Sequence, residues 1–111
     1  MPATNNVALR YFYNKCDMCI NIFFEIVKML NIKDKTLFLI TDKVPNNYLE
    51  KELKELNISL IVMEEIVTDS IVTKSPYFFL LSNKEISNLY FPDWQNPIYI
   101  KEYLENILEQ Y

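Results

Sequence analysis

The sequence predicts an α/β fold in which a mixed sheet of four to five strands has helices on both faces. Apolar segments with strand character alternate with segments whose apolar residues recur every three to four positions, the period of a helix. The run Leu37–Ile40 is apolar throughout, as in strands that a parallel sheet buries on both faces. The predicted order is βαβαβ followed by ββα, and a length of 111 residues suits a single domain over residues 1–111.

The first predicted strand and the first predicted helix meet near a pair of cysteines. Val7–Tyr13 is an apolar and aromatic run with one charge, Arg10, and it predicts a strand. Cys16–Leu30 predicts a helix that is apolar nearly all round, apart from one narrow polar stripe. Such a helix must be covered on most sides, so we expect it to pack on the sheet with other elements close by.

Two further parallel strands follow, with a helix between them. Thr36–Thr41 and Ser59–Met63 are the apolar runs, and right-handed crossovers are expected to join the three parallel strands. Pro45 suits the first turn of the intervening helix, and Asn57 is expected to close that helix.

The last third of the chain no longer alternates parallel strands with helices. Glu64–Lys74 predicts a connecting loop with a short helical or extended turn. Tyr77–Leu81 and Glu85–Phe91 predict an antiparallel hairpin, and Pro97–Gln110 predicts the final helix.

Histidine and glycine are both absent from the chain. The lack of histidine excludes Ser–His and Cys–His catalysis and histidine-ligated metals. The lack of glycine excludes phosphate-binding P-loops and dinucleotide-binding glycine turns. We expect asparagine to occupy the turn positions that need a positive φ.

The formal net charge of −4 and the absence of a Lys/Arg stripe argue against a nucleic-acid partner. No apolar window approaches the length of a membrane span, so no membrane insertion is expected. The start Met1–Asn6 has neither a basic nor an apolar export region. The protein is thus expected to be cytoplasmic, or periplasmic if an export signal has been removed, and the sequence does not distinguish the two.

The pair Cys16 and Cys19 carries the strongest chemical signal. The predicted helix begins at Cys16, where free backbone N–H groups and the helix dipole favour a thiolate, the reactive form of cysteine. Cys19 lies one turn further along the same helix face and can resolve a mixed disulfide formed at Cys16. The sequence therefore predicts that Cys16 is the nucleophile and Cys19 the resolving thiol.

The two cysteines are compatible with other roles. They could be inert core residues, because free cysteine is often buried. They could supply half of a four-thiolate zinc site shared by two chains, because one chain has no further cysteine or histidine ligand. A purely structural disulfide would stabilise little, because the loop that it closes is short.

The layout resembles the thioredoxin superfamily from about Val7 to Gln110. The chain has a strand, a CxxC pair at a helix start, two further strands, Ser75-Pro76 before a strand, a hairpin and a helix. The segment from Met63 to Pro76 resembles the TlpA-like, redoxin-type branch. Position alone predicts a trans Ser75–Pro76 bond, whereas the resemblance implies a cis-proline that faces the cysteines. It also implies that the backbone of Ser75 pairs with a bound substrate strand.

The resemblance implies a thiol–disulfide oxidoreductase of the protein-disulfide reductase type. Its partners would be protein or small-molecule thiols and disulfides. It would need no metal and no organic cofactor, because the two thiols carry the electrons. The chain departs from the family pattern at Lys15, where tryptophan is common, and at Asp17-Met18, where Gly-Pro is usual. These departures motivate an alternative function, that of a non-catalytic thioredoxin-fold interaction module.

Overall fold

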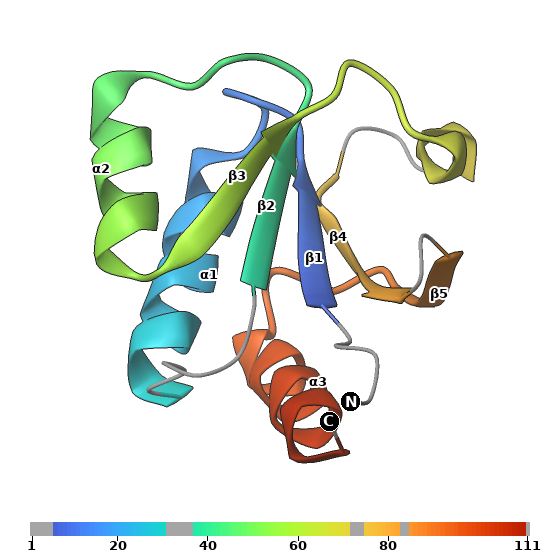
Figure 1. Cartoon of the computed structure of the whole chain (residues 1–111). Helices are drawn as coiled ribbons and strands as arrows, with labels where there is room; N and C mark the ends of the chain where they lie inside the picture. The colour runs from blue at the N-terminus through green and yellow to red at the C-terminus, as the bar shows by residue number, and fades with distance from the viewer. Residues whose placement is uncertain (1–5, 31–36, 72–74, 83–84, 111) are drawn as a thin grey trace.

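The computed structural model describes residues 6–30, 37–71, 75–82 and 85–110 (Figure 1). Within them, the strands are β1 (Asn6–Tyr11), β2 (Leu37–Thr41), β3 (Ile58–Val62), β4 (Tyr77–Ser82) and β5 (Glu85–Tyr90). The helices are α1 (Asp17–Leu30), α2 (Asn47–Glu55), α3 (Pro97–Gln110) and the short 3-10 helix η1 (Val67–Ile71). None of these helices in the described ranges is long and apolar enough to cross a membrane.

The strands form one five-stranded sheet in the order β3-β2-β1-β4-β5. β1 pairs in parallel with β2, and β2 pairs in parallel with β3. β4 runs antiparallel to β1, and β5 runs antiparallel to β4. The predicted mixed sheet is therefore confirmed, with β1 at its centre.

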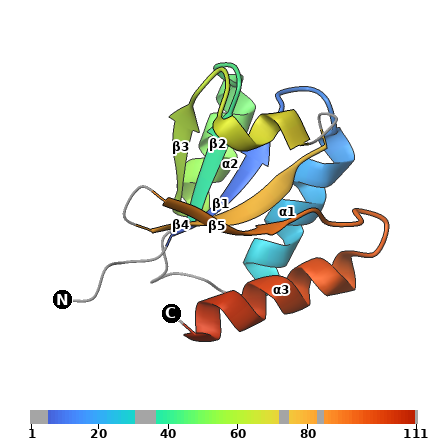
Figure 2. The same ribbon diagram turned by 90° about the vertical axis from the view of Figure 1, so that its right-hand side faces the viewer.

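The two faces of the sheet are covered unequally. Val7, Leu9 and Tyr11 of β1 belong to a large apolar cluster that also contains buried residues of α1, α2 and α3. Ala8 and Phe12 belong to a smaller cluster on the other face, because successive side chains of a strand point to opposite sides. Figures 1 and 2 together show η1 and α2 on opposite sides of the sheet. The three α-helices thus pack on one face, and the segment with η1 covers the other.

Several element boundaries differ from the prediction. β1 ends at Tyr11 because the next residues form a turn. Pro45 lies outside α2, because Asn46 is the N-cap, and its side chain accepts a hydrogen bond of 2.9 Å from the N–H of Leu49. The predicted strand start at Thr36 lies outside the described residues.

Asparagine takes the left-handed backbone positions, as expected for a chain without glycine. In the described residues, every residue with positive φ is an asparagine: Asn14 at 62°, Asn57 at 57° and Asn88 at 52°. Asn57 follows the C-cap of α2 and donates its N–H to the carbonyl of Lys54 at 3.2 Å. The prediction that Asn57 closes this helix is confirmed.

Candidate active site

The two cysteines follow a tight turn that leaves the carboxyl end of β1. The N–H of Lys15 donates to the carbonyl of Phe12 at 3.0 Å, and Asn14 has the left-handed conformation within this turn. The N–H of Tyr13 donates to a carboxylate oxygen of Asp42 at 2.8 Å, which ties the turn to the loop after β2. The position of Cys16 is therefore fixed from both of the central parallel strands.

Asn14→Ala is expected to lower the free energy of unfolding by about 1 kcal/mol, because alanine pays a steric penalty in the left-handed region. Asn14→Gly is the matched control, since glycine adopts positive φ without that penalty. Chemical denaturation of the three oxidised proteins measures the difference. Equal midpoints for the alanine and glycine variants would contradict the strain at Asn14.

Cys16 and Cys19 form a disulfide, with 5.3 Å between their Cα atoms. α1 begins at Asp17, so Cys16 occupies the position just before the helix, where its carbonyl accepts the N–H of Ile20 at 3.3 Å. The N–H of Cys19 donates to Sγ of Cys16 at 3.2 Å. Cys16 is half-buried, whereas Cys19 is 2% exposed. A partner in solution can therefore approach only Cys16.

Ser75 and Pro76 lie at the same edge of the sheet as the cysteine pair. β1 and β4 are antiparallel, with Arg10 opposite Tyr77, so the residues before β4 lie beside the end of β1. Pro76 is buried, Ser75 is exposed, and the indole N–H of Trp94 donates to the carbonyl of Pro76 at 3.1 Å. The cysteine pair after β1 and the Ser75–Pro76 pair before β4 therefore lie at the same end of these two strands.

The prediction of a cis-proline at Pro76 is wrong. The described residues contain no cis peptide bond, so Ser75–Pro76 is trans. The trans form is the intrinsically favoured one for X–Pro bonds, as position alone predicted, and the cis form came only from the family resemblance.

A groove with a volume of about 820 Å³ lies beside the turn that precedes Cys16. Phe12 and Lys15 of that turn line it, together with residues of the loops after β2 and β3 and of η1. Its wall on the η1 side is formed by residues 64–67, 69 and 70, among which Val67 is 82% exposed. The groove thus borders Lys15, the residue that precedes Cys16 in the chain.

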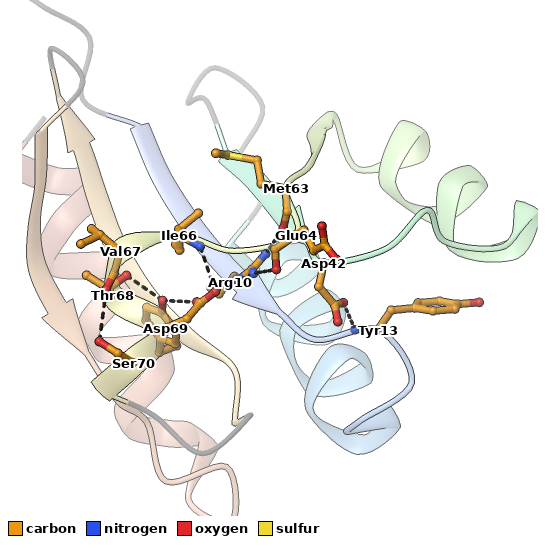
Figure 3. A network of polar contacts seen from close by, with 11 residues as sticks. Arg10, Tyr13, Asp42, Met63, Glu64, Ile66, Val67, Thr68, Asp69 and Ser70 are labelled. Atoms are coloured by element: carbon orange, nitrogen blue, oxygen red, sulfur yellow. Dashed lines mark hydrogen bonds and ion pairs between the residues drawn. The ribbon is translucent and has the colours of Figure 1, made fainter.

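A buried arginine organises the base of this wall (Figure 3). Arg10 of β1 is fully buried and makes two hydrogen bonds with Asp69 of η1, at 3.0 and 2.7 Å. It also donates to the carbonyls of Met63 and Glu64, at 2.9 and 3.0 Å. The guanidinium lies 4.9 Å from the ring centroid of Phe12. One side chain thus holds the centre of the sheet, the loop after β3 and η1 together.

The carboxylate of Asp69 is the hub of the polar network. It also accepts the N–H of Ile66 at 3.0 Å and the hydroxyl of Tyr77 at 2.8 Å. Burial alone would raise the pKa of Asp69, but these hydrogen bonds and the Arg10 charge hold that pKa below its ordinary value of 3.8. Burial raises the pKa of Tyr77 to about 12, so its hydroxyl keeps its proton.

The described residues contain no group of three or more His, Cys, Asp or Glu side chains that could hold a metal ion.

The chain matches no protein-family model and no curated protein sequence. It is similar in structure to StoA from Bacillus subtilis, with a TM-score of 0.53 and 15% identity over 91% of this chain and 82% of StoA. The protein therefore has a thioredoxin-like fold with a disulfide of CxxC spacing.

Sequence reasoning missed Asp69 and Trp94 as residues that shape the site. Arg10 was visible as the one charge in a predicted strand, which signals a buried partner somewhere in the chain. Asp69 lies 59 residues away, in the segment for which the sequence predicts a connecting loop with a short helical or extended turn. Trp94 lies between the last predicted strand and the helix predicted from Pro97, and nothing in the sequence links it to Pro76.

Proposed function

We propose that this protein is a thiol–disulfide oxidoreductase that exchanges disulfides with protein or small-molecule thiols. The observation that carries the proposal is the asymmetry of the pair: Cys16 is half-buried at a helix start, and Cys19 is 2% exposed behind it. The thioredoxin-like fold supports the same function. Within that superfamily, the resemblance of the segment from Met63 to Pro76 favours the TlpA-like branch and a protein-disulfide reductase.

In the reductive direction, the Cys16 thiolate attacks one sulfur of a partner disulfide. A mixed disulfide forms, and the partner's other sulfur leaves as a thiolate that takes a proton from water. The Cys19 thiolate then attacks Sγ of Cys16, which re-forms the Cys16–Cys19 disulfide and releases the second partner thiol. Two electrons pass from the cysteine pair to the partner, and the reverse sequence oxidises a partner dithiol.

The start of α1 stabilises the Cys16 thiolate on which these reaction steps depend. The N–H of Cys19 is aimed at Sγ of Cys16, and a donor in this position stabilises a thiolate more than a thiol. Lys15, next in the chain, adds a positive charge, and Asp17 opposes it. The backbone beside Ser75 and Pro76 is proposed to dock the partner chain at the same edge of the sheet.

The reduced protein is expected to have a Cys16 pKa below that of free cysteine, about 8.5. Titration of thiolate absorbance measures this pKa, and equilibration with reduced and oxidised glutathione measures the two-electron couple. A normal or raised Cys16 pKa together with no disulfide exchange would favour the non-catalytic interaction module. Zinc bound to the reduced protein would favour a thiolate site shared by two chains.

A further inference from the structure

The η1 wall of the groove contains little regular secondary structure that could fix its position. Residues 63–66 form no helix or strand, and η1 is a single short 3-10 segment. Hydrogen bonds within such a segment are too few to fix its position. Its attachment to the sheet must therefore come from side chains.

Arg10 and Asp69 attach the wall to the sheet and also fix its orientation. The guanidinium and the carboxylate meet through two hydrogen bonds, so their relative orientation is fixed as well as their distance. The remaining Arg10 bonds go to the carbonyl of Met63, just before the wall, and to that of Glu64, its first residue. Asp69 in turn accepts the N–H of Ile66, in the middle of it.

Arg10 also contacts Phe12, which lines the groove and begins the turn before Cys16. The Arg10 guanidinium lies over the ring of Phe12, and Phe12 lines the groove. The carbonyl of Phe12 accepts the N–H of Lys15, the residue before Cys16. The buried pair is thus in contact with the η1 wall and with the turn that carries the reactive cysteine.

We propose that Arg10 and Asp69 are positioning residues, which set the η1 wall at the distance from Cys16 that an extended partner chain requires. This inference rests on the proposed disulfide exchange. The wall presents Ile66 and the exposed Val67 to the groove, so the bound chain is expected to place an apolar side chain there, next to its reacting cysteine. We expect a small disulfide to react at Cys16 without contacting this wall.

The test compares two substrates: glutathione disulfide, and a peptide disulfide whose cysteine lies within an extended apolar segment. Asp69→Asn keeps the size of the side chain but removes its charge, and it is expected to lower the peptide-to-glutathione rate ratio about tenfold. Arg10→Lys keeps the charge but cannot make the paired hydrogen bonds, so the same direction is expected. A role in folding alone would change both rates equally.

The matched control is Glu105→Gln, which breaks the ion pair of Glu105 with Lys101 on α3, outside the groove. Its rate ratio is expected to equal that of the wild type. Val67→Asp is a second probe that preserves the fold, because the side chain is 82% exposed, and it is expected to lower the peptide rate selectively.

The outcomes separate the two proposals. Failure of the wild type to exchange with glutathione would refute the proposed function itself. Exchange with glutathione, but an unchanged rate ratio in Asp69→Asn and Val67→Asp, would refute the positioning role alone.

Discussion

Arg10→Met is expected to lower the free energy of unfolding by about 3 kcal/mol, because it removes the fully buried partner of an ion pair whose aspartate is 16% exposed. Arg10 is fully buried, and its loss leaves the carbonyls of Met63 and Glu64 without that donor and the Asp69 carboxylate without its countercharge. Small domains are stable by about 5–15 kcal/mol, so the variant would be only marginally folded. Chemical denaturation of the oxidised proteins measures the change.

A double-mutant cycle isolates the pair itself. Arg10→Met, Asp69→Asn and the double variant are compared, and the double variant is expected to be at least about 1 kcal/mol more stable than the sum of the two losses predicts. Strict additivity would mean that the two side chains stabilise the fold independently, in conflict with their paired hydrogen bonds.

The pH dependence follows from the lowered pKa of Asp69. Because the charged carboxylate is favoured in the folded state, its stabilisation is complete above the unfolded pKa of about 3.9 and is lost as the pH falls through the lower folded pKa. The stability difference between the wild type and Asp69→Asn should therefore be largest near neutral pH and should shrink in acid. A difference that persisted at the lowest accessible pH would contradict the ion pair as its source.

The sheet could be predicted because its signals are local. Each parallel strand is a short apolar run, each α-helix has its own period, and Asn57 marks the end of α2. The position of the cysteine pair could be predicted for the same reason, because a strand, a turn and a helix follow one another within the first 30 residues. The local sequence is enough to indicate elements of this kind, although tertiary packing supplies most of their stability.

The groove and its support could not be predicted, because they depend on residues far apart in sequence. Arg10 and Asp69 are 59 residues apart, and only the paired sheet brings them together. The end of β1 was missed for a related reason. Phe12 and Tyr13 suit a strand by type, but Phe12 begins the turn, and Tyr13 is held to Asp42 after β2. A long-range contact overrides local preference at these positions.

Cys16→Ser is expected to reduce disulfide exchange to the uncatalysed rate, whereas Cys19→Ser is expected to stop turnover after the first step. The difference follows from burial: a partner disulfide can reach the half-buried Cys16, but it cannot reach Cys19, which is 2% exposed. Without Cys19, the mixed disulfide at Cys16 has no resolving thiol and accumulates. Mass spectrometry of each variant after treatment with glutathione disulfide reads out the trapped adduct.

The expected result is one glutathione adduct per chain in Cys19→Ser and none in Cys16→Ser. The conservative change at either site alters one sulfur to oxygen, so both variants are expected to fold without the disulfide, whose short loop stabilises little. Adducts of equal yield in both variants would mean that both thiols are accessible in the reduced protein, and the assignment of Cys16 as the attacking group would then be wrong. An adduct confined to Cys16→Ser would reverse the two roles, because the helix start would then hold the resolving thiol.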